Sequence, residues 1–129
     1  MKGRLLHSDI TEDIFKSFFQ VYHALGYGFL EKAYENSLVI LLREVGHQVS
    51  QQHPVTVYFQ NEPVGEYFAD LVVDNKVIVE LKAAETISEA HEAQLINYLR
   101  ATKIEVGLLL NFGKKPEFRR KVFTNDVKY

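Results

Sequence analysis

The expected fold depends on one short run of sequence, Val77-Ile78-Val79-Glu80-Leu81-Lys82. Branched aliphatic residues favour a β-strand, and successive side chains of a strand point to opposite faces. Val77, Val79 and Leu81 therefore share one face, and Glu80 and Lys82 share the other. A carboxylate and an amine are costly in an apolar strand unless they are paired or used. The run predicts a strand that carries a polar site on one face.

Helices and strands are expected on both sides of this run. Apolar residues at spacings of three and four predict two helices in the first third, and Thr86-Ile87-Ser88-Glu89 has the spacing of a capping box that opens a third. The expected helices end near Leu25, Val45 and Ala101, and the other expected strands cover about 55–59, 64–73 and 105–112. This order implies an α/β fold with a mixed sheet of about four strands, flanked by helices on both faces.

Length and composition are those of an ordinary globular protein. The 129 residues are 47% hydrophobic and 25% charged, so we expect a single domain over 1–129. The absence of cysteine excludes disulfides, thiolate zinc sites and a cysteine nucleophile. No apolar run approaches the roughly 20 residues that cross a bilayer, and the first residues lack an apolar signal region. We expect a cytoplasmic protein with no membrane contact.

Basic residues are concentrated at the end of the chain. Residues 112–129 hold six Lys or Arg and two acidic residues, although the net charge of the whole chain is −2. The near-zero total excludes a whole-molecule attraction to nucleic acid, but not a local one. The basic end is either a solvated terminus or a strip that contacts phosphates. The candidate phosphate contacts are Lys114, Lys115, Arg119, Arg120 and Lys121.

Asp70 is expected beside Glu80 because a short turn joins their two strands. A two-residue loop at 74–75 would point Asp70 away from Glu80, whereas a three-residue loop at 74–76 sets the two acids directly opposite. We predict the three-residue loop, because two carboxylates with Lys82 alongside suit Mg²⁺, which prefers hard oxygen ligands. Lys82 would then orient the attacking water or offset transition-state charge. An interstrand salt bridge would satisfy the same pattern.

Two helices add further polar pairs. Glu31 and Tyr34 are three residues apart, and Gln94 and Tyr98 are four apart, so each pair shares a helix face. The run from 28 to 34 reads G-x-x-E-x-x-Y and resembles the signature of the small bacterial and archaeal GxxExxY proteins. The resemblance continues, in order, through 69–71, 79–83, 91–99 and 106–113, and so covers nearly the whole chain.

The GxxExxY family is similar to the PD-(D/E)xK nuclease superfamily, so the resemblance implies a restriction-endonuclease-like core and a Mg²⁺ or Mn²⁺ cofactor. It implies that Asp70 and Glu80 bind the metal together with the backbone carbonyl of Leu81. Glu31 would match a helix glutamate that helps to hold the metal shell, and Lys82 would match the catalytic lysine.

Gln94 and Tyr98 resemble a Q-x-x-x-Y element whose side chains contact the scissile strand or support the site, and Tyr34 is a further candidate for such a role. The chain departs from the pattern at Ala69, which stands where the superfamily's name has proline.

The expected function is a metal-dependent phosphodiesterase, a nuclease that acts on nucleic acid, with DNA as the expected substrate, by attack of a metal-activated water. The alternative is a nuclease-fold accessory or nucleic-acid-binding protein that does not cut and works with a protein partner or as a homodimer. A third interpretation treats the charged residues as an ion-pair network without a ligand.

Overall fold

The computed structural model of the protein describes residues 5–128. The first half comprises α1 (Ser8–Leu25), α2 (Glu31–Glu44), β1 (Val49–Phe59) and β2 (Glu62–Val73). The second half comprises β3 (Val77–Lys82), α3 (Glu89–Ala101), β4 (Val106–Phe112), β5 (Pro116–Val122) and a short 3₁₀ helix, η1 (Asn125–Val127). The three α-helices and the four predicted strands are all present; the strand predicted at 55–59 begins earlier, at Val49, and the other ends differ by a few residues.

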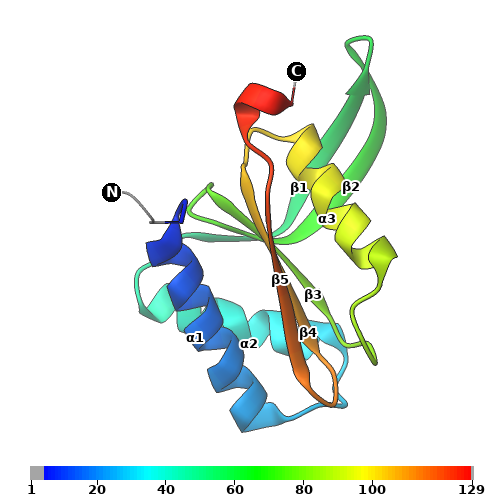
Figure 1. Ribbon diagram of the computed structural model, residues 1–129. Coiled ribbons are helices and arrows are strands. Elements are labelled where there is room, and N and C mark those ends of the chain that lie inside the picture. Colours follow the sequence, from blue (N-terminus) through cyan, green and yellow to red (C-terminus); the bar gives the residue numbers. More distant parts are fainter. Residues whose placement is uncertain (1–4, 129) are drawn as a thin grey trace.

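One mixed sheet organises these elements, in the order β1-β2-β3-β4-β5. β3 and β4 are parallel and are joined through α3, whereas the other neighbours are antiparallel. α1 and α2 cover one face of the sheet and α3 covers the other, and the β1–β2 hairpin extends past the rest of the sheet (Figure 1). The α/β architecture with helices on both faces is confirmed.

The fifth strand was not predicted. Residues 116–122 read as a solvated basic end because Glu117, Arg119, Arg120 and Lys121 interrupt any apolar pattern. In the fold this segment pairs along its whole length with β4 and forms an edge of the sheet. An edge strand tolerates charged side chains, which also discourage pairing with other chains.

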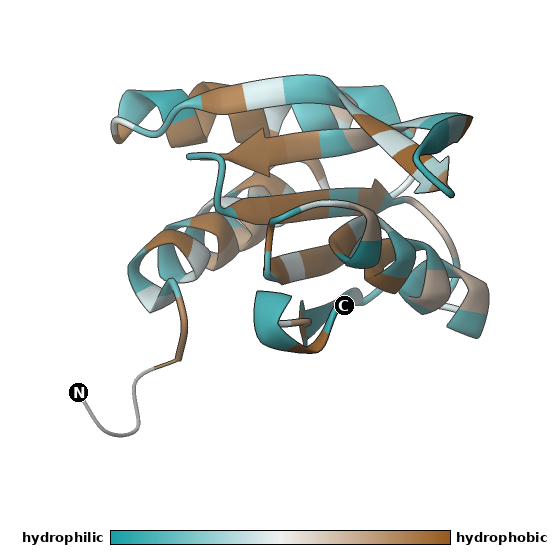
Figure 2. Cartoon of the chain, turned by 90° about the horizontal axis from the view of Figure 1, so that it is seen from above, coloured by the Kyte–Doolittle hydropathy of each residue, from teal (hydrophilic) through white to brown (hydrophobic). Residues whose placement is uncertain are grey.

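Two apolar layers hold the helices to the sheet. The layer under α1 and α2 includes Leu71, Val79 and Leu108, and the layer under α3 includes Ile78 and Leu109. β4 is buried at every residue, as predicted for a strand covered on both faces. Figure 2 shows this apolar character along the central strands, with hydrophilic residues on the outer sides of the helices. The site residues are therefore carried on a rigid, buried support.

The cap of α3 differs from the predicted one. Ser88, rather than Thr86, is the N-cap residue: its hydroxyl accepts a hydrogen bond from the His91 amide at 3.2 Å, and His91 Nδ1 accepts one from the Ser88 amide at 3.1 Å. The predicted capping box began two residues too early, because Thr86 and Glu89 have the same three-residue spacing as Ser88 and His91. Among residues 5–128, no helix is both long and apolar enough to cross a membrane.

Candidate active site

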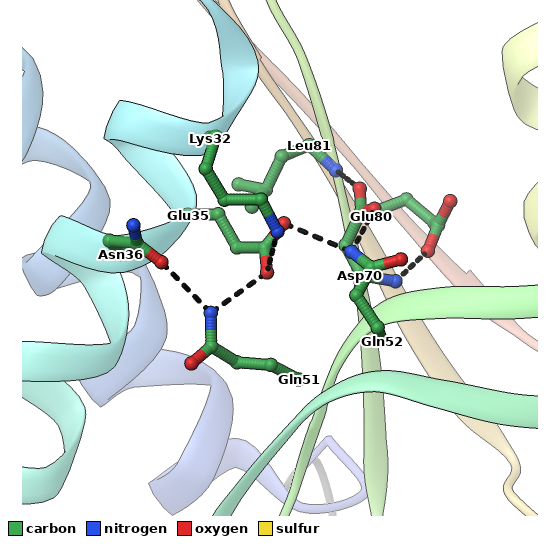
Figure 3. Close-up of polar contacts among 8 residues, drawn as sticks. All are labelled: Lys32, Glu35, Asn36, Gln51, Gln52, Asp70, Glu80 and Leu81. Atoms are coloured by element: carbon green, nitrogen blue, oxygen red, sulfur yellow. Dashed lines mark hydrogen bonds and ion pairs between the residues drawn. The ribbon is translucent and has the colours of Figure 1, made fainter.

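β2 and β3 stop pairing at the position of the two predicted acids. The pairs run from Val73–Val77 to Leu71–Val79, which sets Asp70 opposite Glu80 and confirms the predicted three-residue turn. At the next position, hydrogen bonds between backbone amides and side-chain carboxylates replace the backbone hydrogen bonds of the paired strands. The Asp70 amide donates to Glu80 Oε2 at 2.7 Å, and the Leu81 amide donates to Asp70 Oδ2 at 2.8 Å. The two acids thus hold the separating strands together (Figure 3).

Burial gives both carboxyl groups a raised pKa. Glu80 is 3% exposed, and its burial, together with the neighbouring Asp70 carboxylate, raises its pKa to about 8. Burial also raises the pKa of Asp70, although hydrogen bonds from the Leu81 amide and Gln52 oppose the shift. A buried carboxyl group beside a partly buried one favours the arrival of a positive charge.

Lys82, Gln94 and Tyr98 form a hydrogen-bonded line on the α3 side of the sheet. Lys82 Nζ donates to Gln94 Oε1 at 3.2 Å, and Gln94 Nε2 donates to the Tyr98 hydroxyl at 3.1 Å. Burial and the nearby Glu80 carboxylate raise the pKa of Tyr98, so this line lies beside the acids. The structure therefore brings together these predicted residues from β3 and α3.

Glu31 flanks the acids from the other side. It is the first residue of α2, and its carboxylate accepts a hydrogen bond of 3.4 Å from the amide of Ala83, the residue after Lys82. Its charge contributes to the raised pKa of Glu80. An open hollow of about 690 Å³ lies beside Glu31, and Lys114 is among its lining residues.

Asp70 and Glu80 fit a divalent cation as a pair of ligands. Within residues 5–128, no group of three or more Asp, Glu or His side chains is placed to hold a metal ion, so Glu31 does not complete a three-carboxylate site in this conformation. Two carboxylates suit Mg²⁺, which takes its other ligands from water and phosphate. The Leu81 amide points at Asp70, and the carbonyl of a strand residue points to the same side as its amide. The predicted carbonyl ligand therefore faces the same gap.

Two residues that sequence reasoning missed complete the surroundings of Asp70. Gln52 Nε2 donates to Asp70 Oδ1 at 3.3 Å and to Glu35 Oε1 at 3.1 Å (Figure 3). Glu35 is 3% exposed although it is charged. It lies one helical turn after Glu31, and this spacing is a signal that could have indicated it. No pattern in the sequence marks Gln52.

Tyr34 is buried in the core rather than exposed at the site. Its hydroxyl donates to the Gly26 carbonyl at 2.7 Å and accepts from the Phe29 amide at 3.1 Å, and its ring stacks on Phe112 at 4.1 Å between centroids. A ring with no exposed surface cannot contact a substrate. Its position corrects that part of the prediction and leaves Tyr34 as a support for the loop before Glu31.

The five basic candidates do not form one strip. Lys121 Nζ pairs with Glu92 of α3 at 2.6 Å, and Arg119 approaches the same carboxylate at 4.0 Å. Arg120 lies on the opposite face, where it donates to the Leu6 carbonyl. Lys114 and Lys115 lie in the turn between β4 and β5. The predicted phosphate track is therefore divided between separate parts of the surface.

Comparison with known proteins agrees with this geometry. A family model described as the PD-(D/E)XK nuclease superfamily matches residues 8–121, a range that includes both acids, Lys82 and all of the sheet except the last residue of β5. No curated protein and no solved structure matches the chain.

Proposed function

Since the chain belongs to the PD-(D/E)XK nuclease superfamily, we propose that it is a Mg²⁺- or Mn²⁺-dependent phosphodiesterase that cleaves nucleic acid, with DNA as the expected substrate. The observation that carries this proposal is the meeting of Asp70 and Glu80 where β2 and β3 separate. The G-x-x-E-x-x-Y run at 28–34 supports a place among the GxxExxY proteins within the superfamily.

Asp70 and Glu80 would hold the cation, with the Leu81 carbonyl as a third ligand. A bound divalent cation lowers the pKa of a water molecule and stabilises negative charge on phosphate oxygens. Both carboxylates must be ionised to bind, and the nearby positive charge offsets the burial that otherwise keeps Glu80 protonated. Glu31 adds negative charge at the edge of this site without being close enough to complete the ligand set.

Lys82 would act on the phosphate or on the attacking water. Its ammonium group has three hydrogens, of which one is directed at Gln94. The others are available to a phosphate oxygen or to the water, where they would stabilise charge that develops in the transition state. Gln94 is itself held by Tyr98, so the position of the ammonium group is restricted before substrate arrives.

The neighbouring phosphates would meet basic residues on either side of the acids. Lys114 lines the hollow beside Glu31, and Arg119 and Lys121 lie on the α3 face. To bind phosphate, Arg119 and Lys121 would have to break their ion pairs with Glu92. Charge-assisted hydrogen bonds to the phosphate would replace those pairs.

A cleavage assay with matched lysine variants tests this proposal. Wild type, Lys82→Ala and Lys103→Ala are compared on single-stranded, duplex and flapped DNA in Mn²⁺. Lys103 is exposed and lies beyond the end of α3, in the connection to β4. We expect Lys82→Ala to lower the cleavage rate by about 10²-fold or more, a typical loss for such a group, and Lys103→Ala to cleave like wild type.

The same assay separates the alternatives. Equal cleavage by wild type and Lys82→Ala would identify a contaminating nuclease and contradict the proposal. No cleavage by wild type on any substrate, with DNA binding retained, would favour the non-cleaving accessory role.

A further inference from the structure

The side-chain amide of Gln52 connects two carboxylates that belong to different elements. Its Nε2 lies 3.1 Å from Glu35 Oε1 on α2 and 3.3 Å from Asp70 Oδ1 on β2. An amide nitrogen carries two hydrogens, so one group donates to both acids at once. Figure 3 shows Gln52 between the helix and the strands, with its amide directed at both carboxylates.

Glu35 is a fixed anchor for this amide. The other oxygen of its carboxylate accepts hydrogen bonds from Lys32 Nζ at 3.2 Å and from Gln51 Nε2 at 2.9 Å. The side chain is almost completely buried, and a buried charge with several donors has little freedom to turn. Because both Glu35 oxygens accept only, the amide of Gln52 must present its nitrogen, and the same nitrogen reaches Asp70.

The backbone at Gln52 is distorted at the same place. β1 pairs with β2 at Gln51–Leu71 and at His53–Ala69, and Gln52 between them has a left-handed φ of 49°. A residue other than glycine adopts this conformation at an energetic cost, and such costs are found where the surroundings require a particular side-chain position. The register places Gln52 opposite Asp70, so the distorted backbone lies at the position that faces this acid.

We propose that Gln52, anchored by Glu35, is a positioning residue that holds the Asp70 carboxylate in the orientation needed to bind the divalent cation, an inference that rests on the proposed function. Asp70 Oδ2 is held by the Leu81 amide and Oδ1 by Gln52, so the plane of the carboxylate is defined from both sides. Each oxygen keeps a lone pair for a cation. Groups that orient a metal ligand in this way typically contribute 10–100-fold to metal affinity.

Calorimetric titration of the metal-free protein with Mn²⁺ tests this inference without an activity measurement. We expect Gln52→Ala to weaken Mn²⁺ binding by about tenfold or more. Gln20→Ala is the matched control, because Gln20 is an exposed residue of α1 that takes no part in the contacts of Glu35 or Asp70; it should change affinity by less than about twofold. Gln52→Gly, which suits the left-handed backbone, replaces Gln52→Ala if that variant unfolds.

Glu35→Ala and the double variant Glu35→Ala/Gln52→Ala test whether Glu35 acts through Gln52. If Glu35 acts through Gln52, the double variant binds Mn²⁺ about as well as Gln52→Ala alone, because coupled residues are not additive. Additive losses would show that Glu35 acts by charge alone and would overturn its role as anchor. Unchanged affinity in Gln52→Ala, or equal losses in Gln20→Ala and Gln52→Ala, would overturn the positioning role.

Asp70→Asn separates this inference from the proposed function. If wild type binds Mn²⁺ and Asp70→Asn does not, the metal site stands whatever the Gln52 variants show. If wild type itself does not bind Mn²⁺, or if Asp70→Asn binds as wild type does, the proposed metal site fails, and the role of Gln52 fails with it.

Discussion

Glu80 accepts a hydrogen bond of 2.7 Å from the backbone amide of Asp70, across two strands that no longer pair with each other. The bond joins the two acids through an amide and a carboxyl oxygen, and it leaves their charges adjacent in a buried setting. The loss of stability that this arrangement causes in the metal-free protein can be measured. So can the gain in stability when a cation binds.

Glu80→Gln should stabilise the metal-free protein at alkaline pH. The folded pKa of Glu80, about 8, is above its ordinary value of 4.5, so the folded state binds a proton that the unfolded state has released, and stability falls as pH rises from 4.5 to 8. Glutamine keeps the acceptor for the Asp70 amide without the charge. In EDTA at pH 8, urea unfolding should show a gain of about 1–3 kcal/mol over wild type, and the gain should shrink at pH 5.

Glu62→Gln is the control for this change, because Glu62 is an exposed acid at the tip of the β1–β2 hairpin. It should alter stability by less than about 0.5 kcal/mol at either pH. A destabilised Glu80→Gln protein at pH 8 would show that the ionised carboxylate is favourable without metal.

Mn²⁺ should reverse the order of stability of wild type and Glu80→Gln. A ligand that binds the folded state at 100 times its Kd stabilises it by about 2.7 kcal/mol, and wild type at pH 8 has both carboxylates to bind the ion. Glu80→Gln lacks one of them and should gain little. Thermal unfolding with and without Mn²⁺ measures both shifts, and equal shifts would place the ion elsewhere on the molecule.

Tyr98→Phe should lower the cleavage rate without unfolding the protein. The ring, which is 6% exposed, is kept, but Gln94 Nε2 loses its acceptor, so the amide that holds Lys82 can turn. We expect about a tenfold lower rate in Mn²⁺, with Mn²⁺ affinity unchanged. Tyr67→Phe is the matched control, since its ring lies 6.2 Å from that of Tyr98 and it is not part of the line to Lys82. Equal rates for Tyr98→Phe and wild type would remove Tyr98 from the site.

The opposed acids could be predicted from the sequence because their placement depends on local properties. Side-chain alternation along β3 and the length of one turn together determine the register of Asp70 against Glu80. The spacing of Gln94 and Tyr98 placed them on one helix face, and the resemblance to the Q-x-x-x-Y element assigned them to the site. These residues needed no knowledge of how distant segments pack.

The role of Gln52, the burial of Glu35 and the strand β5 could not be predicted in this way. Gln52 contacts groups 17 and 18 residues away, and these contacts depend on how β1 pairs with β2 and packs against α2. Glu35 reads as an ordinary exposed helix residue until β1 covers it. The charged residues of 116–122 give no strand pattern in the sequence, and the segment forms a strand by pairing with β4 alone.

Gly107→Ala should test how closely α3 must approach the sheet. A Cβ at Gly107 would lie 2.6 Å from Leu95 Cδ1, so either the Leu95 side chain or the helix that carries both Leu95 and Gln94 would have to move. Overpacking of this kind costs about 1–3 kcal/mol, which urea unfolding measures. Gly107→Ala/Leu95→Ala should lose less than the sum of the two single changes. A fully stable Gly107→Ala protein would show that the contact between Leu95 and β4 relaxes at no cost.

His47 joins three separate segments at the end of the sheet away from the acids. Its Nε2 lies 2.7 Å from Asp13 Oδ2 on α1, and its Nδ1 lies 2.6 Å from Asp74 Oδ2 in the β2–β3 turn. Burial lowers the pKa of His47, but the hydrogen bonds to Asp13 and Asp74 outweigh burial and raise the pKa overall. Only the protonated ring donates from both nitrogens.

His47→Ala should therefore destabilise the protein more at low pH than at high pH. A raised folded pKa gives stability that is fully present below the unfolded value of about 6.5 and is lost as pH rises through the folded value. We expect a deficit of about 1–3 kcal/mol at pH 6 that falls by half or more at pH 9, measured by urea unfolding. His23→Ala, which removes an exposed histidine of α1, should cost less than about 0.5 kcal/mol at both pH values. A deficit for His47→Ala that is constant or grows with pH would mean that the neutral ring, not the imidazolium, joins the three segments.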